Sequence, residues 1–429
     1  MGGLKEMGGI AGSREAVREK SSESGSAKRI GFDQGLSSMT SPLRVRLLHV
    51  FPSFGQGGVP LRICDLANRL GERYRHSFLA LDGDLAARAR LAPSLGARCR
   101  ALPLSRYGLW ATIKAYRRLF RDERPDLLLT YNWGAVECAL ANSLLRPLPH
   151  IHFESGFGPE EAERQLKRRV LFRRLALRRS HRIVVPSRRL FELATGDWRL
   201  DRARVQLIPN GVDAARFDGR PGRSVPLAGA GDAKTVTIGT VAPLRPEKNL
   251  GRLLAAFAGL ERDDLRLVIA GDGSERQALE SLAGRLGIAR KTRFLGHRED
   301  VPAVLGSLDI FALTSDTEQM PNSLLQAMAA GRPVAAVDVG DVATILPPAS
   351  RAFVCAKEDR AGFMRILLRL IDDAALREEL GRANQAHVRA VYGLDRMVET
   401  YRALFEEALA LQRAVERRGP ALSVADAQS

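Results

Sequence analysis

Short apolar runs that alternate with longer helical stretches are the feature that most constrains the fold of this chain. A first series of strand-like runs lies at residues 45–51, 77–81, 127–131, 150–153, 182–186 and 205–208. A second series lies at residues 236–241, 265–270, 292–295, 310–314 and 333–337. Because helical stretches separate the runs, each series predicts a parallel sheet covered by helices on both faces. We therefore predict an α/β chain with two Rossmann-like parallel-sheet domains that face a central cleft.

The segments around the two series set the expected domain boundaries. Residues 1–42 are rich in glycine, serine and charge, and Met39 is a second candidate for the start of translation. The expected order is a disordered leader at 1–42, an N-terminal domain at 43–217, a linker at 218–234, a C-terminal domain at 235–385, C-terminal helices at 386–415 and a flexible tail at 416–429.

Composition narrows the class of protein. Of the 429 residues, 45% are hydrophobic, which is enough for a large core, and no apolar run approaches the roughly 20 residues that span a bilayer. The four cysteines are widely scattered, which favours a reducing cytoplasm over a disulfide framework. The seven histidines form no metal-ligand pattern, and we predict no metal site. The net charge of +17 is compatible with anionic membrane or an acidic substrate.

The loop after the first strand of the second series carries two cations. Residues 239–249 bring a strand to a turn that holds Arg245 and Lys248, three positions apart at a helix start. Arginine can bind two phosphate oxygens at once, and lysine adds a point charge. The loop is therefore either a phosphate site in the cleft or an ordinary solvated turn.

A later loop offers a helix start with free amides. After the strand at 310–314, a polar loop carries Glu318, and a helix begins near Pro321. The free N–H groups of residues 322–324 form an anion site at the helix N-terminus. Glu318 lies just before this point, where it can accept hydrogen bonds from hydroxyl groups.

A third loop has a glycine pattern that is easily overinterpreted. Gly271 and Gly273 follow a strand, but Arg276 replaces the third glycine of the dinucleotide fingerprint. We interpret this loop as a tight strand-to-helix turn and not as a phosphate cradle.

Together the three loops, with the Pro-Asn-Gly-Val-Asp turn at 209–213, resemble the donor domain of retaining GT-B glycosyltransferases of family four, over roughly residues 44–405. The resemblance implies a GT-B fold, with an acceptor domain first and a nucleotide-sugar donor domain second. It implies that Glu318 contacts hydroxyls of the donor sugar and that Arg245 and Lys248 neutralise the leaving diphosphate. The other positions expected at the donor are Gly57, Gly58, Gly239, Arg298, Pro321, Asn322, Ser323, Leu324 and Gln326.

Gln326 departs from the pattern of that family. A second glutamate, eight positions after the first, binds the ribose hydroxyls in the family, and this chain has Gln326 there. An amide offers one oxygen acceptor without charge assistance, so we expect weaker ribose binding, by about 1 kcal/mol.

The first half contributes a glycine loop and a histidine pair. Gly57 and Gly58 permit close approach of the backbone to a ligand, although a flexible turn would look the same. His150 and His152 share one face of a predicted strand. The resemblance favours His152 as the histidine near the reacting sugar, while a structural role stays open. Glu154 is a weaker candidate, for the acceptor or for plain surface.

Two charged segments have more than one interpretation. The run from Arg164 to Arg182 holds no acidic residue, and Leu166, Val170, Leu171 and Leu175 fall near one helical face. It predicts contact with an anionic membrane, binding of an acidic acceptor, or a solvated face over a core stripe. Aromatic residues are few and not interleaved with it, so we predict no nucleic-acid partner. The Asp82-Gly83-Asp84 triplet resembles a metal-binding motif of another fold, but we interpret it as a turn.

These observations predict a glycosyltransferase that needs no metal and no cofactor. It would move a sugar from a nucleotide diphosphate-sugar, with UDP-sugar as the leading guess, to a glycan or lipid-linked acceptor. The resemblance suggests cell-surface polysaccharide or lipid-linked glycan assembly, in the cytoplasm or at the inner face of the membrane. A nucleotide-sugar epimerase and a non-catalytic GT-B binding protein are the alternatives. The broken glycine fingerprint argues against an NAD-dependent dehydrogenase.

Overall fold

The computed structural model describes residues 44–103, 108–145, 148–157, 161, 165–218 and 235–417. The expected leader, nearly all of the expected linker, most of the expected tail and Arg164 lie outside the described residues. Within the described residues, no helix is long and apolar enough to cross a bilayer.

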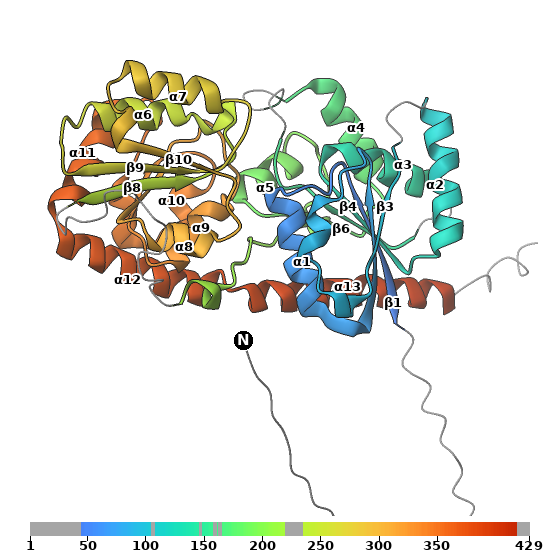
Figure 1. Ribbon diagram of the computed structural model, residues 1–429. Coiled ribbons are helices and arrows are strands. Elements are labelled where there is room, and N and C mark those ends of the chain that lie inside the picture. Colours follow the sequence, from blue (N-terminus) through green and yellow to red (C-terminus); the bar gives the residue numbers. More distant parts are fainter. Residues whose placement is uncertain are drawn as a thin grey trace, which may run out of the picture. The chain divides into compact units, whose positions relative to one another are not determined.

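The first half of the described chain builds a parallel sheet of seven strands in the order β3-β2-β1-β4-β5-β6-β7. Its strands are β1 (Val45–Phe51), β2 (Tyr74–Ala80), β3 (Arg98–Ala101), β4 (Leu127–Tyr131), β5 (His150–Phe153), β6 (Arg182–Val185) and β7 (Val205–Leu207). Its helices are α1 (Gly58–Leu70), α2 (Leu109–Glu123), α3 (Val136–Leu144), α4 (Lys167–Leu177) and α5 (Arg188–Thr195). Figure 1 shows these strands with helices packed on the two faces of the sheet.

The second half builds a parallel sheet of six strands in the order β10-β9-β8-β11-β12-β13. Its strands are β8 (Val236–Val241), β9 (Leu265–Ala270), β10 (Thr292–Gly296), β11 (Ile310–Leu313), β12 (Val334–Val337) and β13 (Val354–Cys355). The helices of this half are α6 (Leu250–Ala258), α7 (Arg276–Arg285), α8 (Val301–Gly306), α9 (Asn322–Ala329), α10 (Val342–Ile345), α11 (Arg360–Asp372) and α12 (Ala374–Val391).

The strand order reverses between β1 and β4 in the first sheet and between β8 and β11 in the second. Ligands of open α/β sheets bind outside the carboxyl ends of the strands at such switch points. Because β8 and β11 are hydrogen-bonded neighbours, the loops that follow them must meet. The predicted α/β class with two parallel sheets is confirmed.

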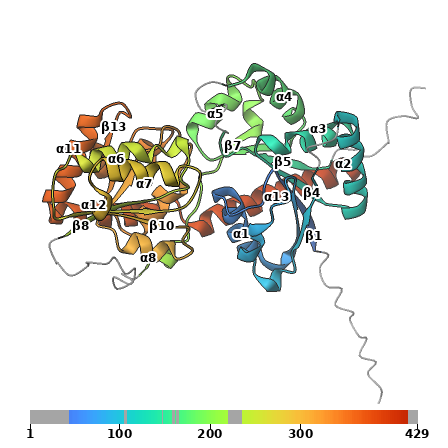
Figure 2. The same cartoon turned by 45° about the horizontal axis from the view of Figure 1, so that its top comes forward.

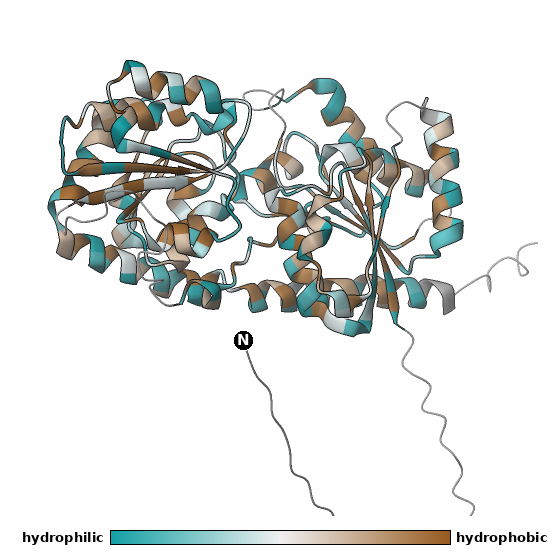
Figure 3. Cartoon of the chain, viewed as in Figure 1, coloured by the Kyte–Doolittle hydropathy of each residue, from teal (hydrophilic) through white to brown (hydrophobic). Residues whose placement is uncertain are grey.

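The apolar runs are readable in the sequence because most of the strands are buried on both faces. Every residue of β4 and of β11 is buried, as expected for parallel sheets covered on both sides. Figure 3 shows this as brown strands in both sheets, with teal residues on the outer sides of the helices. The strands that the sequence missed lack such runs: β3 is an exposed edge strand, and β13 has only two residues.

The last helix, α13 (Leu394–Arg417), packs against the first sheet and not the second. Met397, Tyr401 and Phe405 join the core of the first half, where the ring of Tyr401 stacks on Phe153 with centroids 5.5 Å apart. Figures 1 and 2 both show α13 running beside the strands of the first sheet. The expected boundary at 385/386 falls inside α12, and the chain changes packing partner later, at Gly393.

Candidate functional site

The ends of β8 and β11 bring Lys248 and Glu318 into contact. The Nζ atom of Lys248 lies 2.6 Å from Oε1 of Glu318, and the hydroxyl of Ser315 donates to the same oxygen at 2.8 Å. Only 19% of the lysine side chain and 11% of the glutamate side chain are exposed. Two loops whose residues are 70 positions apart in the sequence thus form one charged centre. Ser315 is a member of this centre that was not predicted from the sequence.

Two further residues, Arg252 and Asn249, fix the loop after β11. Arg252 donates to the carbonyl oxygen of Thr314 at 2.6 Å and to Asp316 at 2.8 Å. Asn249 has a left-handed backbone with φ of 41°, and its side chain donates to both oxygens of Asp316. These contacts hold the polar loop against the start of α6, which positions Glu318. Asn249 and Arg252 were not predicted as site residues from the sequence; an asparagine directly before a helix, such as Asn249, is the pattern that could have indicated this contact.

Helix α9 begins at the predicted point with uncapped amides. Its N-cap is Pro321, which makes no side-chain cap, and its first turn has no acidic residue. The amides of residues 322–324 are therefore at the positive end of the helix dipole. The side chain of Leu324 is fully buried, so only its backbone faces a ligand. Ser323 and Gln326 are half-buried.

The glycine loop of the first half lies beside this helix start. The side-chain NH₂ of Asn322 donates to the carbonyl oxygen of Gly58 at 3.3 Å, and the side-chain oxygen of Asn322 accepts from the side chain of Asn210 at 2.9 Å. A Cβ at Gly58 would lie 2.9 Å from the Asn322 side-chain nitrogen, which is too close. Gly57 and Gly58, named from the sequence, are thus placed at the α9 start, and Asn210 is an addition from the structure.

The two predicted arginines differ in their surroundings. Arg245 is exposed, and its side chain makes no hydrogen bond or ion pair with any described residue. Arg298 forms a two-pronged ion pair with Asp300, at 2.8 and 2.6 Å, which raises the pKa of the guanidinium. A ligand would meet Arg245 as an unengaged cation and Arg298 only in competition with Asp300.

Gly239, which the resemblance places in the donor set, is a strand residue in the structure. It lies inside β8, where it pairs with Phe311 and Val268. A Cβ there would lie 2.5 Å from Leu308 and 2.7 Å from the carbonyl oxygen of Val268. This glycine therefore lets Leu308, which follows α8, and the neighbouring strand β9 approach β8 closely.

His152 is fully buried instead of lining an open cleft. Its Nδ1 lies 2.8 Å from the hydroxyl of Thr130, and its Nε2 lies 3.7 Å from Glu154. His150 binds the same hydroxyl at 2.8 Å, so the two histidines share a face as expected. Burial lowers the pKa of His150 to about 3, which keeps it neutral. A role for His152 in the reaction stays a prediction.

Arg173 does not lie on an exposed basic face of α4. It is fully buried, donates to Glu161 at 2.8 Å and lies 4.8 Å from the ring centres of both Trp133 and Trp198. Burial opposes the ionised form of Glu161, but the hydrogen bonds from Arg173 outweigh it, so the pKa of Glu161 is lowered. Because tertiary contacts create this cage, sequence periodicity gave no sign of it.

The apolar residues predicted to share one face of α4 do not all have the same environment. Val170 packs against the core of the first half, whereas Leu171 and Leu175 are 57% and 58% exposed. The exposed face of α4 therefore mixes leucines with basic residues, and the buried face is built from Arg173 and its neighbours.

The loop at residues 271–273 and the Asp82-Gly83-Asp84 triplet are both turns in the structure, as predicted. A Cβ at Gly271 would lie 1.8 Å from the carbonyl oxygen of Ala242, so this glycine lets two loops pass. In the Asp82-Gly83-Asp84 turn, Asp82 accepts from the amide of Asp84 at 2.9 Å, and Gly83 has φ of 90°. Among the described residues, no group of three or more His, Cys, Asp and Glu side chains could hold a metal ion.

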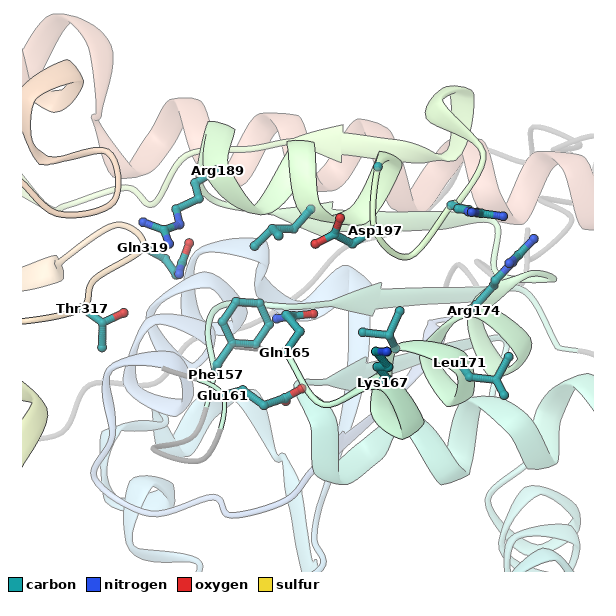
Figure 4. Close-up of a pocket in the computed structure, with 14 residues that line it drawn as sticks. Phe157, Glu161, Gln165, Lys167, Leu171, Arg174, Arg189, Asp197, Thr317 and Gln319 are labelled. Carbon is teal, nitrogen blue, oxygen red and sulfur yellow. The ribbon is translucent and has the colours of Figure 1, made fainter. Parts of the chain in front are cut away.

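A cavity of about 710 Å³ opens beside the charged centre. Thr317 and Gln319, the two neighbours of Glu318, line it together with residues of α4 and α5 (Figure 4). Ser187 donates to Gln319 at 3.1 Å, and the amide of Arg188 donates to Asp341 at 2.7 Å. These bonds join the two halves of the protein at the cavity.

Both halves of the chain match known families. Residues 56–216 match the family described as Glycosyltransferase Family 4, and residues 230–387 match the family described as Glycosyl transferases group 1. A 2-deoxystreptamine N-acetyl-D-glucosaminyltransferase of Streptomyces fradiae is 26% identical over 81% of this chain and 90% of its own length. A D-inositol 3-phosphate glycosyltransferase of Salinispora tropica is 28% identical over 66% of this chain and 61% of its own length.

Solved structures show the same fold. Anabaena HepE, in complex with UDP and glucose, aligns with a TM-score of 0.73 and 19% identity, over 85% of this chain and 100% of that one. WaaG, a glycosyltransferase involved in lipopolysaccharide biosynthesis, aligns with a TM-score of 0.66 and 16% identity, over 83% and 99% of the two chains. The predicted GT-B architecture is therefore confirmed.

Proposed function

Because the chain belongs to the glycosyltransferases of family 4 and group 1, we propose that it transfers a sugar from a UDP-sugar to an acceptor hydroxyl, with retained configuration and without a metal ion. The contact between Lys248 and Glu318 next to the uncapped start of α9 carries this proposal. It gathers a cation, a carboxylate and free amides at the switch point of the second sheet.

The leaving diphosphate is the group that this centre suits. Breaking the bond between sugar and diphosphate builds negative charge on the phosphate oxygens. Lys248, which Glu318 holds, and the α9 amides are fixed donors for that charge, and exposed Arg245 adds a further cation. Removal of one preorganised donor typically costs about 3 kcal/mol of barrier. Cations held by the fold can supply the neutralisation that a metal ion provides elsewhere, which is why we propose catalysis without metal.

Glu318 is the proposed contact for the donor sugar. Its carboxylate is mostly buried, and the hydroxyl of Ser315 holds one oxygen, so it can accept from sugar hydroxyls in a fixed direction. Gln326 lies about one turn into α9, where we propose that it faces the ribose. The solved relatives that carry UDP or UDP-glucose support UDP as the nucleotide.

The exposed face of α4 supports a place at an anionic membrane. Lys167, Arg168, Leu171, Arg174 and Leu175 are all exposed on this helix. Helix α3 packs against α4, and α2 packs against α3. These two helices carry further exposed apolar side chains, Trp110 on α2 with 81% of its surface exposed and Leu144 on α3 with 60%. Cations mixed with apolar groups attract anionic lipid and insert at its surface. We propose that the enzyme works at the cytoplasmic face of a membrane, in glycan assembly.

Release of UDP from a panel of nucleotide sugars tests the proposed reaction. We expect release from a UDP-sugar by the wild-type protein, in the presence of EDTA as in its absence. Lys248→Ala and Glu318→Ala should each slow release by about 100-fold. Unchanged release in both variants would exclude this centre as the site of transfer, and loss of release in EDTA would exclude catalysis without metal.

A further inference from the structure

The cavity beside Glu318 has two ends that are lined by different residues. Thr317, Gln319 and Arg189 lie close together at one end, and Lys167 and Arg174 lie at the opposite end (Figure 4). The first end adjoins the residue that binds the donor sugar in the proposed function. A molecule in this cavity therefore lies next to the sugar that is to be transferred.

Four basic side chains line the cavity: Lys167, Arg174, Arg189 and Arg199. Within the part of the chain that the structure describes, none of these four side chains makes a hydrogen bond or an ion pair. Two carboxylates also line the cavity, but Glu161 is already bound by Arg173 and Arg169. Asp197 is then the one carboxylate left to balance four cations among the described lining residues, so the cavity attracts anions.

Buried residues that do not line the cavity hold two of its wall residues, Gln165 and Glu161, in place. The indole N–H of Trp198 donates to Gln165 at 2.6 Å, and Arg173 fixes Glu161. Arg173 is itself caged between Trp133 and Trp198 and fully buried. Gln165 and Glu161 thus have defined positions before any ligand arrives, which lowers the cost of ordering the site on binding.

We propose that this cavity binds the acceptor and that the acceptor carries a phosphate group. The inference rests on the proposed function of the neighbouring centre. A phosphate monoester has a charge of about −1.5 to −2 at neutral pH, which matches several cations better than one carboxylate does. Arginine also binds two phosphate oxygens at once. Apolar side chains such as Phe157 and Leu193 line the remaining wall.

Binding of matched probes tests this inference. Glucose 6-phosphate and glucose are titrated calorimetrically into the full chain saturated with UDP. We expect the phosphate ester to bind at least about tenfold more tightly than glucose. The variant Arg189→Gln/Arg199→Gln removes two cavity cations that lie outside α4, and should lower affinity for the ester about tenfold while leaving affinity for UDP unchanged.

Matched variants separate the cavity from overall charge. Arg285→Gln/Arg290→Gln removes two exposed cations of the second half and should leave all affinities within about twofold. Lys167→Gln/Arg174→Gln, at the opposite end, should lower affinity for the ester as well, which keeps the test valid if the first variant fails to fold.

The phosphate can belong to a soluble ester or to a lipid headgroup, and vesicles distinguish the two. Sedimentation with phosphatidylcholine vesicles containing 20% phosphatidic acid should weaken in Arg189→Gln/Arg199→Gln if a lipid headgroup enters the cavity. With a soluble acceptor, only binding of glucose 6-phosphate weakens. Equal binding of glucose and its phosphate, or unchanged ester affinity in both cavity variants, would overturn the inference. Failure of UDP to bind would instead refute the proposed function.

Discussion

Removal of Lys248 should separate its role in stability from its role in the reaction. The pair with Glu318 is neither exposed nor fully buried, with 19% and 11% of the side chains accessible and 2.6 Å between the charged atoms. Exposed pairs contribute about 0–1 kcal/mol, and breaking a fully buried pair costs about 3–5 kcal/mol. Because Ser315 still donates to the orphaned carboxylate, we expect Lys248→Met to lower the free energy of unfolding by about 2 kcal/mol.

The double variant Lys248→Met/Glu318→Gln is the matched control. Its neutral amide needs no counter-charge and can still accept from Ser315, so the loss of stability should fall below about 1 kcal/mol. Release of UDP should not recover, because the cation for the leaving diphosphate is still missing, at a cost of about 3 kcal/mol or about 100-fold in rate.

Urea unfolding gives the stability of each variant, and UDP release gives its activity. Recovery of activity in the double variant would contradict the roles of both Lys248 and Glu318, because this variant lacks the cation and the carboxylate. Activity of Lys248→Met within about threefold of the wild type would refute its assignment to the diphosphate.

Three other predictions concern the ribose pocket, the last helix and a buried histidine. Gln326→Glu should tighten UDP binding by up to about fivefold, as measured by calorimetry, and equal or weaker binding would show a pocket rebuilt around glutamine. Tyr401→Ala should lower the free energy of unfolding by about 3–5 kcal/mol because it empties a buried site in the first core, whereas Leu411→Ala, at 50% exposure on the same helix, should cost less than about 1 kcal/mol. Burial lowers the pKa of His76 to about 4, so protonation favours the unfolded chain; stability is complete above about pH 6.5 and falls toward pH 4. Between pH 7 and pH 5, His76 should account for about 2 kcal/mol of the loss of stability, beside the losses from buried His49 and His150. The variant His76→Gln should therefore reduce the loss by about that amount, and an equal pH dependence in that variant would contradict this origin.

The sequence predicts those parts of the fold that depend on continuous burial. The strands at Val45–Phe51, Leu127–Tyr131 and Val236–Val241 lie where the apolar runs indicate, because both faces of each strand are covered. The meeting of Lys248 and Glu318 was also predictable, since loops after neighbouring strands share an edge of the sheet.

Other features depend on contacts that no local pattern records. Gly239 is predicted at the donor from the resemblance, and its strand is located correctly, but the close contacts that require a glycine there come from Leu308 and the neighbouring strand. Arg173 belongs to a run for which the sequence leaves an anionic membrane, an acidic acceptor and a solvated face open, yet Trp133 and Trp198 from distant parts of the chain enclose it. The packing of α13 on the first sheet is likewise a long-range choice that amphipathic periodicity leaves open.

A thermal-shift panel of nucleotide sugars on the purified protein tests the central claim most directly, because it reports the base and the sugar together. We predict that a UDP-sugar at about 100 times its Kd stabilises the wild-type protein by about 2.7 kcal/mol, seen as a rise in Tm. The double variant Lys248→Met/Glu318→Gln should lose most of this rise while keeping a folded core. A Tm that no nucleotide sugar raises, or an equal rise in the variant, would contradict the account of this site.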